Sequence, residues 1–441
     1  MVGDLMRYHP VASLGKATIE SPMLEKHGEE IFVDDSRRLM AFHEPEALGT
    51  ERAVVFMLAG PRRRIFHDPA TTTAAIITCG GLCPGLNNVI RSAALELIHN
   101  YDVPRVLGIR YGYEGLNPDA GHEMIELTPA KVDSIHRQGG TILGSSRGPQ
   151  DVKVMASTLR RLGVNVLLVI GGDGTQRGAA ALGAACRELG VQISIVGIPK
   201  TIDNDVAHCD RSFGFSTAVH EASEAIRAAH EEARGAYNGV GLVKLMGRDA
   251  GFIVAGATLA SQEVNFALVP ENPFTLEGDG GLLDLLEKRL VSRQHAVIAV
   301  AEGAGQELFD GTGETDASGN RRYGDIGPLL RERIEAHFRS RRIPLTLKYI
   351  DPSYIIRSVP ASTEDAVLCD QYARLAVHAA MAGTTEAVVC FCRGMFALVP
   401  STLVTSSKRH MALDGVLWRG VLASTGQPAS MRGQPPVGNR A

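Results

Sequence analysis

The stretch Val166–Leu189, VLLVIGGDGTQRGAAALGAACREL, joins a short apolar run to a glycine-rich turn and then to an alanine-rich segment. The run VLLVI is typical of a buried strand, and the alanine-rich segment favours a helix. A strand, a tight turn and a helix in direct succession are the repeating unit of a parallel α/β sheet. The stretch therefore predicts an α/β fold.

The same order recurs on both sides of this stretch. AIIT at Ala75–Thr78 leads into CGGLCPGLNNVIR, and ISIV at Ile193–Val196 leads into GIPKTIDNDV. A helix is predicted after the second of these, because alanines recur there at three- and four-residue spacing, namely Ala218, Ala222, Ala225, Ala229 and Ala233. Further strands are expected at Val240–Lys244 and Ala296–Ala301. Because sites in such sheets lie beyond the carboxyl ends of the strands, the polar turns are expected to form one site.

Composition limits the kind of protein. The 441 residues suffice for two or three domains, and 44% hydrophobic with 21% charged residues is ordinary for a globular chain. A net charge of −4 argues against a broadly basic nucleic-acid binder, and no apolar run approaches the ~20 residues of a membrane span. The N-terminus lacks a secretory pattern, and the seven cysteines include no CxxC pair. We expect a cytoplasmic protein with reduced cysteines.

Three turns carry candidate chemistry. CGGLCPGLNNVIR could present helix N–H groups to an anion, although a plain strand-to-helix connection explains its glycines equally well. In GGDGT, Asp173 offers a hard oxygen to Mg²⁺, directly or through water, and Gly174 leaves room for a ligand. In PKTIDND, Asp203 can act as a base with Thr201 as its hydrogen-bond partner. Lys200 can supply charge, whereas Asn204 and Asp205 are also common turn formers.

The motifs together resemble the 6-phosphofructokinases between about Ala75 and Val399. The matching segments occur in the family's order: CGGLCPGLNNVIR, GGTILGSSRG, IGGDGTQRGA, IPKTIDNDV, KLMGRDAGFIVAGATLA, AEGAGQ and KYIDPSYIIRSVPAS. The resemblance implies two Rossmann-like domains with parallel-rich sheets flanked by helices and an active site in the cleft between them. It implies Mg²⁺-assisted transfer of the ATP γ-phosphoryl group to the 1-hydroxyl of fructose 6-phosphate, a step of glycolysis. It also implies an allosteric homotetramer.

The resemblance assigns roles to individual positions. Asp203, Arg248 and Thr201 would be catalytic, with Asp203 as proton acceptor and Arg248 as charge stabiliser. The nucleotide phosphates and metal would contact Gly81, Arg147, Gly148, Gly172, Asp173, Gly174 and Thr175, with Asp173 placed for Mg²⁺. The sugar phosphate would contact Thr201, Ile202, Asp203, Met246, Gly247, Arg248, Glu302, Tyr354, Ile355, Ile356 and Arg357.

The sequence departs from many bacterial members of the family at the sugar-phosphate motif. Those members have histidine where this chain has Tyr354 and arginine at about the position of Lys348. In some members one subunit also contributes an arginine to the site of its neighbour, and this chain has Gly239 at about that position. The YIDPSY motif instead resembles the branch that includes pyrophosphate enzymes and the ATP enzymes of plants and trypanosomatids. Effector rules of the short bacterial enzymes are therefore not expected to apply.

Two positions bear on the phosphoryl donor. Pyrophosphate-using relatives carry an aspartate at the position of Gly174, where it would occupy the region of the ATP α-phosphate. They also carry a lysine at the position of Lys200. This chain therefore shares Lys200 with the pyrophosphate enzymes but has glycine at 174, as an ATP enzyme would. Steric exclusion outweighs an added cation, and ATP is predicted as the donor. The alternatives are a pyrophosphate-dependent enzyme, a kinase of another sugar phosphate such as sedoheptulose 7-phosphate, and a catalytically silent sensor.

The expected organisation follows from these motifs. Residues 310–327 are polar and glycine-rich and predict a long surface loop or arm. The predicted parts are an N-terminal extension at 1–71, a nucleotide-binding domain at 72–214 plus 361–397, a sugar-phosphate-binding domain at 215–360 plus 398–423, and a flexible tail at 424–441.

Overall fold

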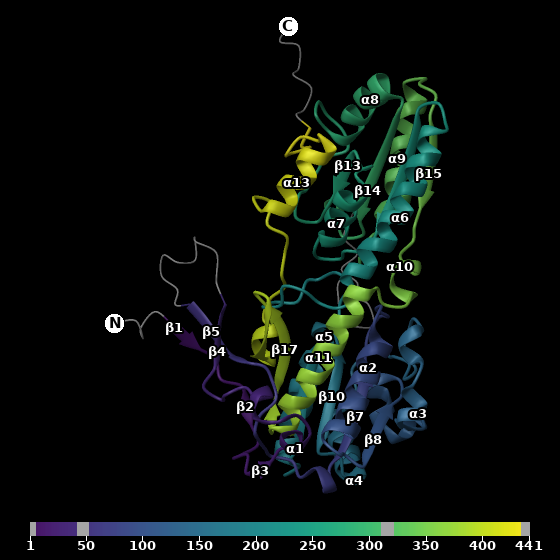
Figure 1. The fold of residues 1–441 in the computed structure, drawn as a ribbon. Helices are drawn as coiled ribbons and strands as arrows, with labels where there is room; N and C mark the ends of the chain where they lie inside the picture. The colour runs from purple at the N-terminus through teal and green to yellow at the C-terminus, as the bar shows by residue number, and fades with distance from the viewer. Residues whose placement is uncertain (1–5, 42–52, 310–321, 434–441) are drawn as a thin grey trace. The chain divides into compact units, whose positions relative to one another are not determined.

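The computed structural model describes residues 6–41, 53–309 and 322–433, and the chain divides into two units (Figure 1). The first unit comprises Met1–Gly214 and Ser358–Lys408, and the second comprises Phe215–Arg357 and Arg409–Ala441. In the described part of the chain, no helix is both long and apolar enough to cross a membrane. The segment at 310–321, which holds most of the predicted arm, lies outside the described residues.

Five parallel neighbours form the centre of the sheet in the first unit. In sheet order they are β17 (Ala387–Cys392), β11 (Ser194–Pro199), β10 (Val166–Gly171), β7 (Thr73–Thr78) and β8 (Arg105–Ile109). Every residue of β10 and β11 is buried, as their continuous apolar runs predict. The predicted parallel-rich α/β fold is confirmed.

Helices pack against this sheet. In Figure 1, α2 (Leu86–Leu95) and α11 (Thr363–Met381) lie side by side and contact each other, and α11 also contacts β10 and β11. Helices α4 (Val152–Leu162) and α5 (Asp173–Glu188) bury their apolar sides in a separate cluster with alternate strand residues such as Leu167. The alternation of side chains along each strand thus provides a core on both faces of the sheet.

The N-terminal extension contributes strands to the first unit. β5 (Ala53–Leu58) pairs with β4 (Arg38–Ala41), β1 (Met6–Tyr8) and β18 (Met395–Pro400), and thereby continues the sheet beyond β17. Because β18 and the following α12 (Ser401–Val404) belong to the first unit, the chain leaves this unit after Lys408 and not at 398. The predicted boundary at 397/398 differs because β18 is the antiparallel partner of β17.

The second unit has a smaller parallel sheet. Its described strands follow the order β13 (Phe266–Leu268), β14 (His295–Ala301), β12 (Gly239–Leu245) and β15 (Thr346–Ile350). The helices that contact this sheet are α6 (Phe215–Arg234), α7 (Phe252–Ser261), α8 (Leu282–Arg293), α9 (Ile326–Ser340) and α13 (Val416–Thr425), and the short α10 (Ile355–Ser358) follows β15 in the chain. The alanines of α6 allow close packing on β12, where a Cβ on Gly241 would lie 2.7 Å from the Ala229 carbonyl oxygen.

The C-terminal segment corrects the predicted flexible tail. The Gln427 side chain accepts a 2.6 Å hydrogen bond from the Ala267 amide and donates one of 3.2 Å to its carbonyl. Met431 is buried, and its carbonyl accepts from the Thr275 amide. Residues 424–433 are therefore packed on the second unit, because specific hydrogen bonds hold a sequence of polar composition, and 434–441 lie outside the described residues.

Candidate active site

The three polar turns of the first unit follow neighbouring strands. β7, β10 and β11 lie next to one another, and the backbone continues their pairing past the strand ends. The Cys79 amide donates to the Ile170 carbonyl at 2.9 Å, and the Lys200 amide donates to the Gly171 carbonyl at 3.1 Å. The sheet therefore brings the predicted phosphate and base turns to one edge.

The first turn is joined to the segment that contains Arg147. Gly80 has φ of +84°, which favours glycine, and its amide donates to the Ser146 carbonyl at 3.1 Å. Ser145 Oγ donates back to the Gly80 carbonyl at 2.6 Å. Gly81, Arg147 and Gly148 thus lie in two hydrogen-bonded loops, with the Arg147 side chain exposed.

The second turn connects β10 to the start of α5. Gly172 is the N-cap residue of α5 and provides no side-chain cap for the helix amides. A Cβ on Gly171 would lie 2.4 Å from Thr175, so this turn requires glycine for packing. A Cβ on the exposed Gly174 would meet Arg177 Nη2 at 3.8 Å, an ordinary contact, and the local fold leaves space there. The free amides of an uncapped helix N-terminus beside such space can donate hydrogen bonds to phosphate oxygens.

Asp173 lies in a charged environment at this helix start. Its carboxylate is 3.7 Å from Lys408 Nζ, and the same ammonium is 3.1 Å from the Asp205 carboxylate. The pKa of Asp173 is raised to about 6, first by burial and second by the Asp205 charge, while Lys408 opposes the shift. Two carboxylates that share one cation fit a site for Mg²⁺, whose remaining ligands would be phosphate oxygens and water.

The third turn is held by its own side chains. Thr201 Oγ1 donates to Asp205 at 3.0 Å and accepts from the Asp203 amide at 3.1 Å. Asn204 has φ of +56°, and its side-chain oxygen accepts from the Ser212 amide at 2.9 Å. These contacts fix the backbone on both sides of the predicted base, whereas the Ile202 side chain is buried and serves the core.

Lys200 crosses from the third turn to the first. Its ammonium donates a 2.6 Å hydrogen bond to the Gly81 carbonyl, and the residue is 7% exposed. This contact joins the PKTIDND turn to the CGGLCPG turn.

The second unit carries its own set of predicted residues after β12 and β14. The Glu302 amide donates to the Leu245 carbonyl at 2.9 Å, and the Gly303 amide donates to the Gly247 carbonyl at 3.1 Å. Met246–Arg248 and Glu302 are thereby brought together. Burial raises the pKa of Glu302, while the Arg248 charge lowers it. The Arg248 guanidinium lies 4.3 Å from the centre of the Tyr323 ring.

The loop after β15 presents an aromatic–cationic pair. The Arg357 guanidinium lies 4.8 Å from the centre of the Tyr354 ring, and Tyr354 and Ile355 are 76% and 62% exposed. The Ile356 side chain is fully buried, which leaves its main chain for any ligand contact. Tyr354 and Arg357 together offer the surface and charge that a phosphate group requires.

Sequence reasoning did not identify Lys408 or Tyr323 as site residues. Each contacts a predicted site residue that is distant in sequence: Lys408 contacts Asp173, and Tyr323 contacts Arg248. Tyr323 OH also donates to the Asp249 carboxylate at 3.0 Å. No motif spacing signals either residue, because neither shares a turn with its partner.

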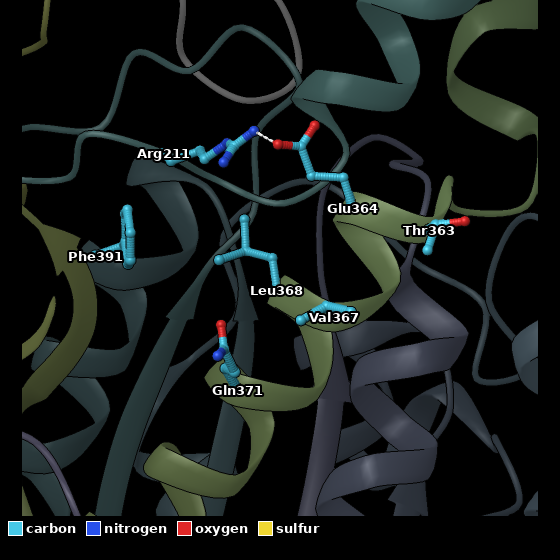
Figure 2. Close-up of a pocket in the computed structure, with 7 residues that line it drawn as sticks. All are labelled: Arg211, Thr363, Glu364, Val367, Leu368, Gln371 and Phe391. Carbon is cyan, nitrogen blue, oxygen red and sulfur yellow. Dashed lines mark hydrogen bonds and ion pairs between the residues drawn. The ribbon is translucent and has the colours of Figure 1, made fainter. Parts of the chain in front are cut away.

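A separate pocket of about 440 Å³ lies in the first unit (Figure 2). Figure 2 shows an ion pair between Arg211 and Glu364 at one side of this pocket and Phe391 at another. Its lining residues are Arg211, Thr363, Glu364, Val367, Leu368, Gln371 and Phe391. None of these is a predicted site residue, so the pocket is distinct from the three turns.

Comparison with known proteins gives consistent matches. The family model described as Phosphofructokinase matches residues 73–380. A curated protein named ATP-dependent 6-phosphofructokinase from Amycolatopsis methanolica is 48% identical over 436 residues, covering 97% of this chain and 94% of the relative. Proteins of the same name from Trypanosoma brucei brucei (51% identical, 82% of this chain, 75% of the relative) and Borreliella burgdorferi (43%, 96% and 97%) also match.

A solved structure shows the same fold at low sequence identity. A pyrophosphate-dependent phosphofructokinase from Marinobacter aquaeolei matches with a TM-score of 0.66 and 19% identity, covering 83% of this chain and 94% of the other. At that identity the likeness concerns the fold alone.

Proposed function

Because this chain belongs to the phosphofructokinase family, we propose that it transfers the γ-phosphoryl group of ATP to the 1-hydroxyl of fructose 6-phosphate. The family resemblance predicted from the motifs is confirmed by the family match and the relatives. The observation that carries the proposal is the similarity over 97% of the chain to a protein whose name states both the donor and the reaction.

In the proposed reaction, the first unit supplies the base and the phosphate contacts. Asp203 would accept the proton of the 1-hydroxyl as its oxygen attacks the γ-phosphorus in line and the bond to ADP breaks. Thr201 supports this step through its hydrogen bond from the Asp203 amide. Gly81, Arg147, Gly148 and Gly172–Thr175 would bind the nucleotide phosphates.

Asp173 would hold Mg²⁺, with Asp205 nearby. The metal, when bound, neutralises charge on the β- and γ-phosphoryl oxygens. Burial and the nearby Asp205 charge raise the pKa of Asp173, which supports a site that gains stability from a cation.

The second unit would bind the sugar phosphate. Arg248 would stabilise the charge that develops in transfer, Glu302 would accept hydrogen bonds from sugar hydroxyls, and Tyr354–Arg357 would hold the 6-phosphate. Met246 and Gly247 would line the sugar.

Gly174 supports ATP as the donor. The residue adds no side chain at the start of α5, and an added Cβ would meet no atom closer than Arg177 Nη2 at 3.8 Å, which supports room for a nucleotide phosphate there. Lys200, the feature shared with pyrophosphate enzymes, already has a hydrogen bond to the Gly81 carbonyl. This contact supports a structural role for Lys200 that would be the same with either donor.

Steady-state assays that cross two donors with two acceptors test the proposal. ATP and pyrophosphate would each be combined with fructose 6-phosphate and sedoheptulose 7-phosphate. We expect kcat/KM to be highest for ATP with fructose 6-phosphate. A preference for pyrophosphate or for the seven-carbon sugar would contradict the donor or the acceptor assignment separately.

We also propose an allosterically regulated homotetramer that acts in the cytoplasm. The basis is the family likeness. Light scattering at assay concentrations is expected to give four times the mass of the chain, and a monomer would contradict this assignment.

A further inference from the structure

We propose that Lys408 is a positioning residue for the base Asp203, acting through Asp205 and Thr201. The inference rests on the proposed function and adds a residue outside every predicted site motif. Lys408 comes from the chain segment after α12, about two hundred residues beyond the turn that it contacts.

A continuous series of hydrogen bonds leads from Lys408 to the base. Lys408 Nζ donates to Asp205 Oδ2 at 3.1 Å, and the other carboxylate oxygen of Asp205 accepts from Thr201 Oγ1 at 3.0 Å. Thr201 Oγ1 accepts in turn from the Asp203 amide at 3.1 Å. Asp205 uses one carboxylate oxygen for each of its two partners, and the Thr201 hydroxyl donates one hydrogen bond and accepts the other. The direction of every bond is therefore consistent.

The backbone also holds Lys408 against this turn. Lys408 and Val206 form an isolated antiparallel bridge immediately after the PKTIDND turn. The Lys408 side chain is 34% exposed and the Asp205 side chain 9% exposed, so the ammonium approaches from the solvent side of a nearly buried carboxylate. Hydrogen bonds between charged groups are stronger than neutral ones, and a buried carboxylate benefits most from them.

The residues that follow Lys408 are held in the second unit. The Arg409 guanidinium lies 4.6 Å from the centre of the Phe252 ring, and His410 Nδ1 lies 2.9 Å from the Asp249 carbonyl. The Met411 amide donates to Glu271, which also accepts from the Gly251 amide. Residues 409–411 therefore have fixed contacts within the second unit.

The charge of Lys408 suits this place. Asp173 and Asp205 both lie within 4 Å of its ammonium, and two carboxylates near one another repel. With a neutral residue at 408, Asp205 would lose its cation and its hold on Thr201 would loosen. The base would then sample positions away from the acceptor hydroxyl, which lowers kcat more than substrate binding.

The test compares three variants with the wild-type chain. Lys408→Met removes the charge and keeps the aliphatic length, Lys408→Arg restores a donor, and Lys288→Met removes a surface lysine that pairs with Asp284 at 2.8 Å. We expect Lys408→Met to lower kcat by roughly 10- to 100-fold, the effect of losing one hydrogen bond between charged groups. KM values for both substrates should change by less than about threefold. Lys408→Arg should recover most of the rate, and Lys288→Met should match the wild type.

A double-mutant cycle with Asp203→Asn separates positioning from general damage. If Lys408 acts through the base, Lys408→Met should have little further effect on kcat once the base is removed. A full multiplicative loss in the Asp203→Asn background would overturn the proposal. So would unchanged kcat in Lys408→Met, or a loss that Lys408→Arg does not recover although the melting temperature stays normal.

The failure of this inference can be distinguished from failure of the proposed function. Wild-type protein without phosphoryl transfer from ATP to fructose 6-phosphate would contradict the function itself. Wild-type activity combined with an unaffected Lys408→Met variant would contradict the role of Lys408 and leave the function standing.

Discussion

Lys200 Nζ donates a 2.6 Å hydrogen bond to the carbonyl oxygen of Gly81, and this bond joins turns that leave two different strands. β10 lies between those strands, so the lysine side chain reaches past the strand that leads into the GGDGT turn. The position of the CGGLCPG turn therefore depends on a side chain of the PKTIDND turn.

Replacing Lys200 by methionine should loosen the nucleotide turns without changing the donor. Loss of this buried, charged hydrogen bond is expected to cost about 1–3 kcal/mol of stability, and KM for ATP should rise. Urea unfolding and ATP kinetics measure the two effects. Unchanged ATP kinetics together with altered use of pyrophosphate would show that Lys200 selects the donor instead.

Gly174→Asp should lower kcat/KM for ATP by at least ~10-fold while the fold is retained. Gly174 follows the first residue of α5, where a Cβ meets no close neighbour and a negative charge favours the helix. Repulsion of the nucleotide phosphates by only about 1.4 kcal/mol would lower kcat/KM for ATP ~10-fold. The control Gly174→Ala adds the Cβ without charge and should retain more activity. Equal ATP kinetics in both variants would refute the charge argument.

Asp203→Asn should lower kcat and leave sugar binding largely intact. An amide cannot accept the hydroxyl proton, and general-base catalysis is typically worth ~10²–10⁴-fold. The Asp203 amide bond to Thr201 is a main-chain contact, so the substitution preserves it. Wild-type turnover in this variant would remove Asp203 from the mechanism.

Asp173→Asn should stabilise the metal-free protein at alkaline pH. Burial raises the pKa of Asp173 from 3.8 to about 6, so the folded state prefers the protonated acid. The associated stability is present below pH 4 and is lost as pH rises through 6, whereas asparagine stays neutral throughout. With a side chain 15% exposed, the gain at pH 8 is on the order of 3 kcal/mol at most.

Unfolding of both proteins in EDTA, measured between pH 4.5 and 8, checks this expectation. The difference in unfolding free energy should grow with pH, and a difference independent of pH would contradict it.

Arg357→Ala should raise KM for fructose 6-phosphate more than KM for ATP. Arg357 and Tyr354 belong to the second unit, and the guanidinium offers paired donors to a phosphate. The matched control is Arg331→Ala, because Arg331 is an exposed arginine of α9 that pairs with Glu335. A loss confined to ATP would place Arg357 with the nucleotide.

The sequence predicted the parts of the fold that local pattern controls. β10 and β11 are continuous apolar runs and α6 buries an alanine face, so strands, helices and the turns between them follow from residue order. Parallel pairing then places Asp173 and Asp203 at one edge of the sheet. The predicted residues within each unit could be grouped for the same reason.

The remaining features depend on contacts between distant segments. β5 completes the sheet of the first unit by pairing with β18, more than three hundred residues later. Lys408 and Tyr323 reach their partners from segments that carry no recognisable motif. The composition of residues 424–433 predicts disorder, but two hydrogen bonds from one glutamine and a buried methionine decide otherwise.

Gln427 covers part of a sheet edge at which two molecules of this protein could otherwise pair. Among the described strands of the smaller sheet, β13 lies at one of the two edges, and its outward amide and carbonyl at Ala267 would otherwise offer a template for strand addition. The primary amide of Gln427 satisfies both groups in the way that a neighbouring strand would. A side chain that imitates a peptide group thus closes this edge against aggregation.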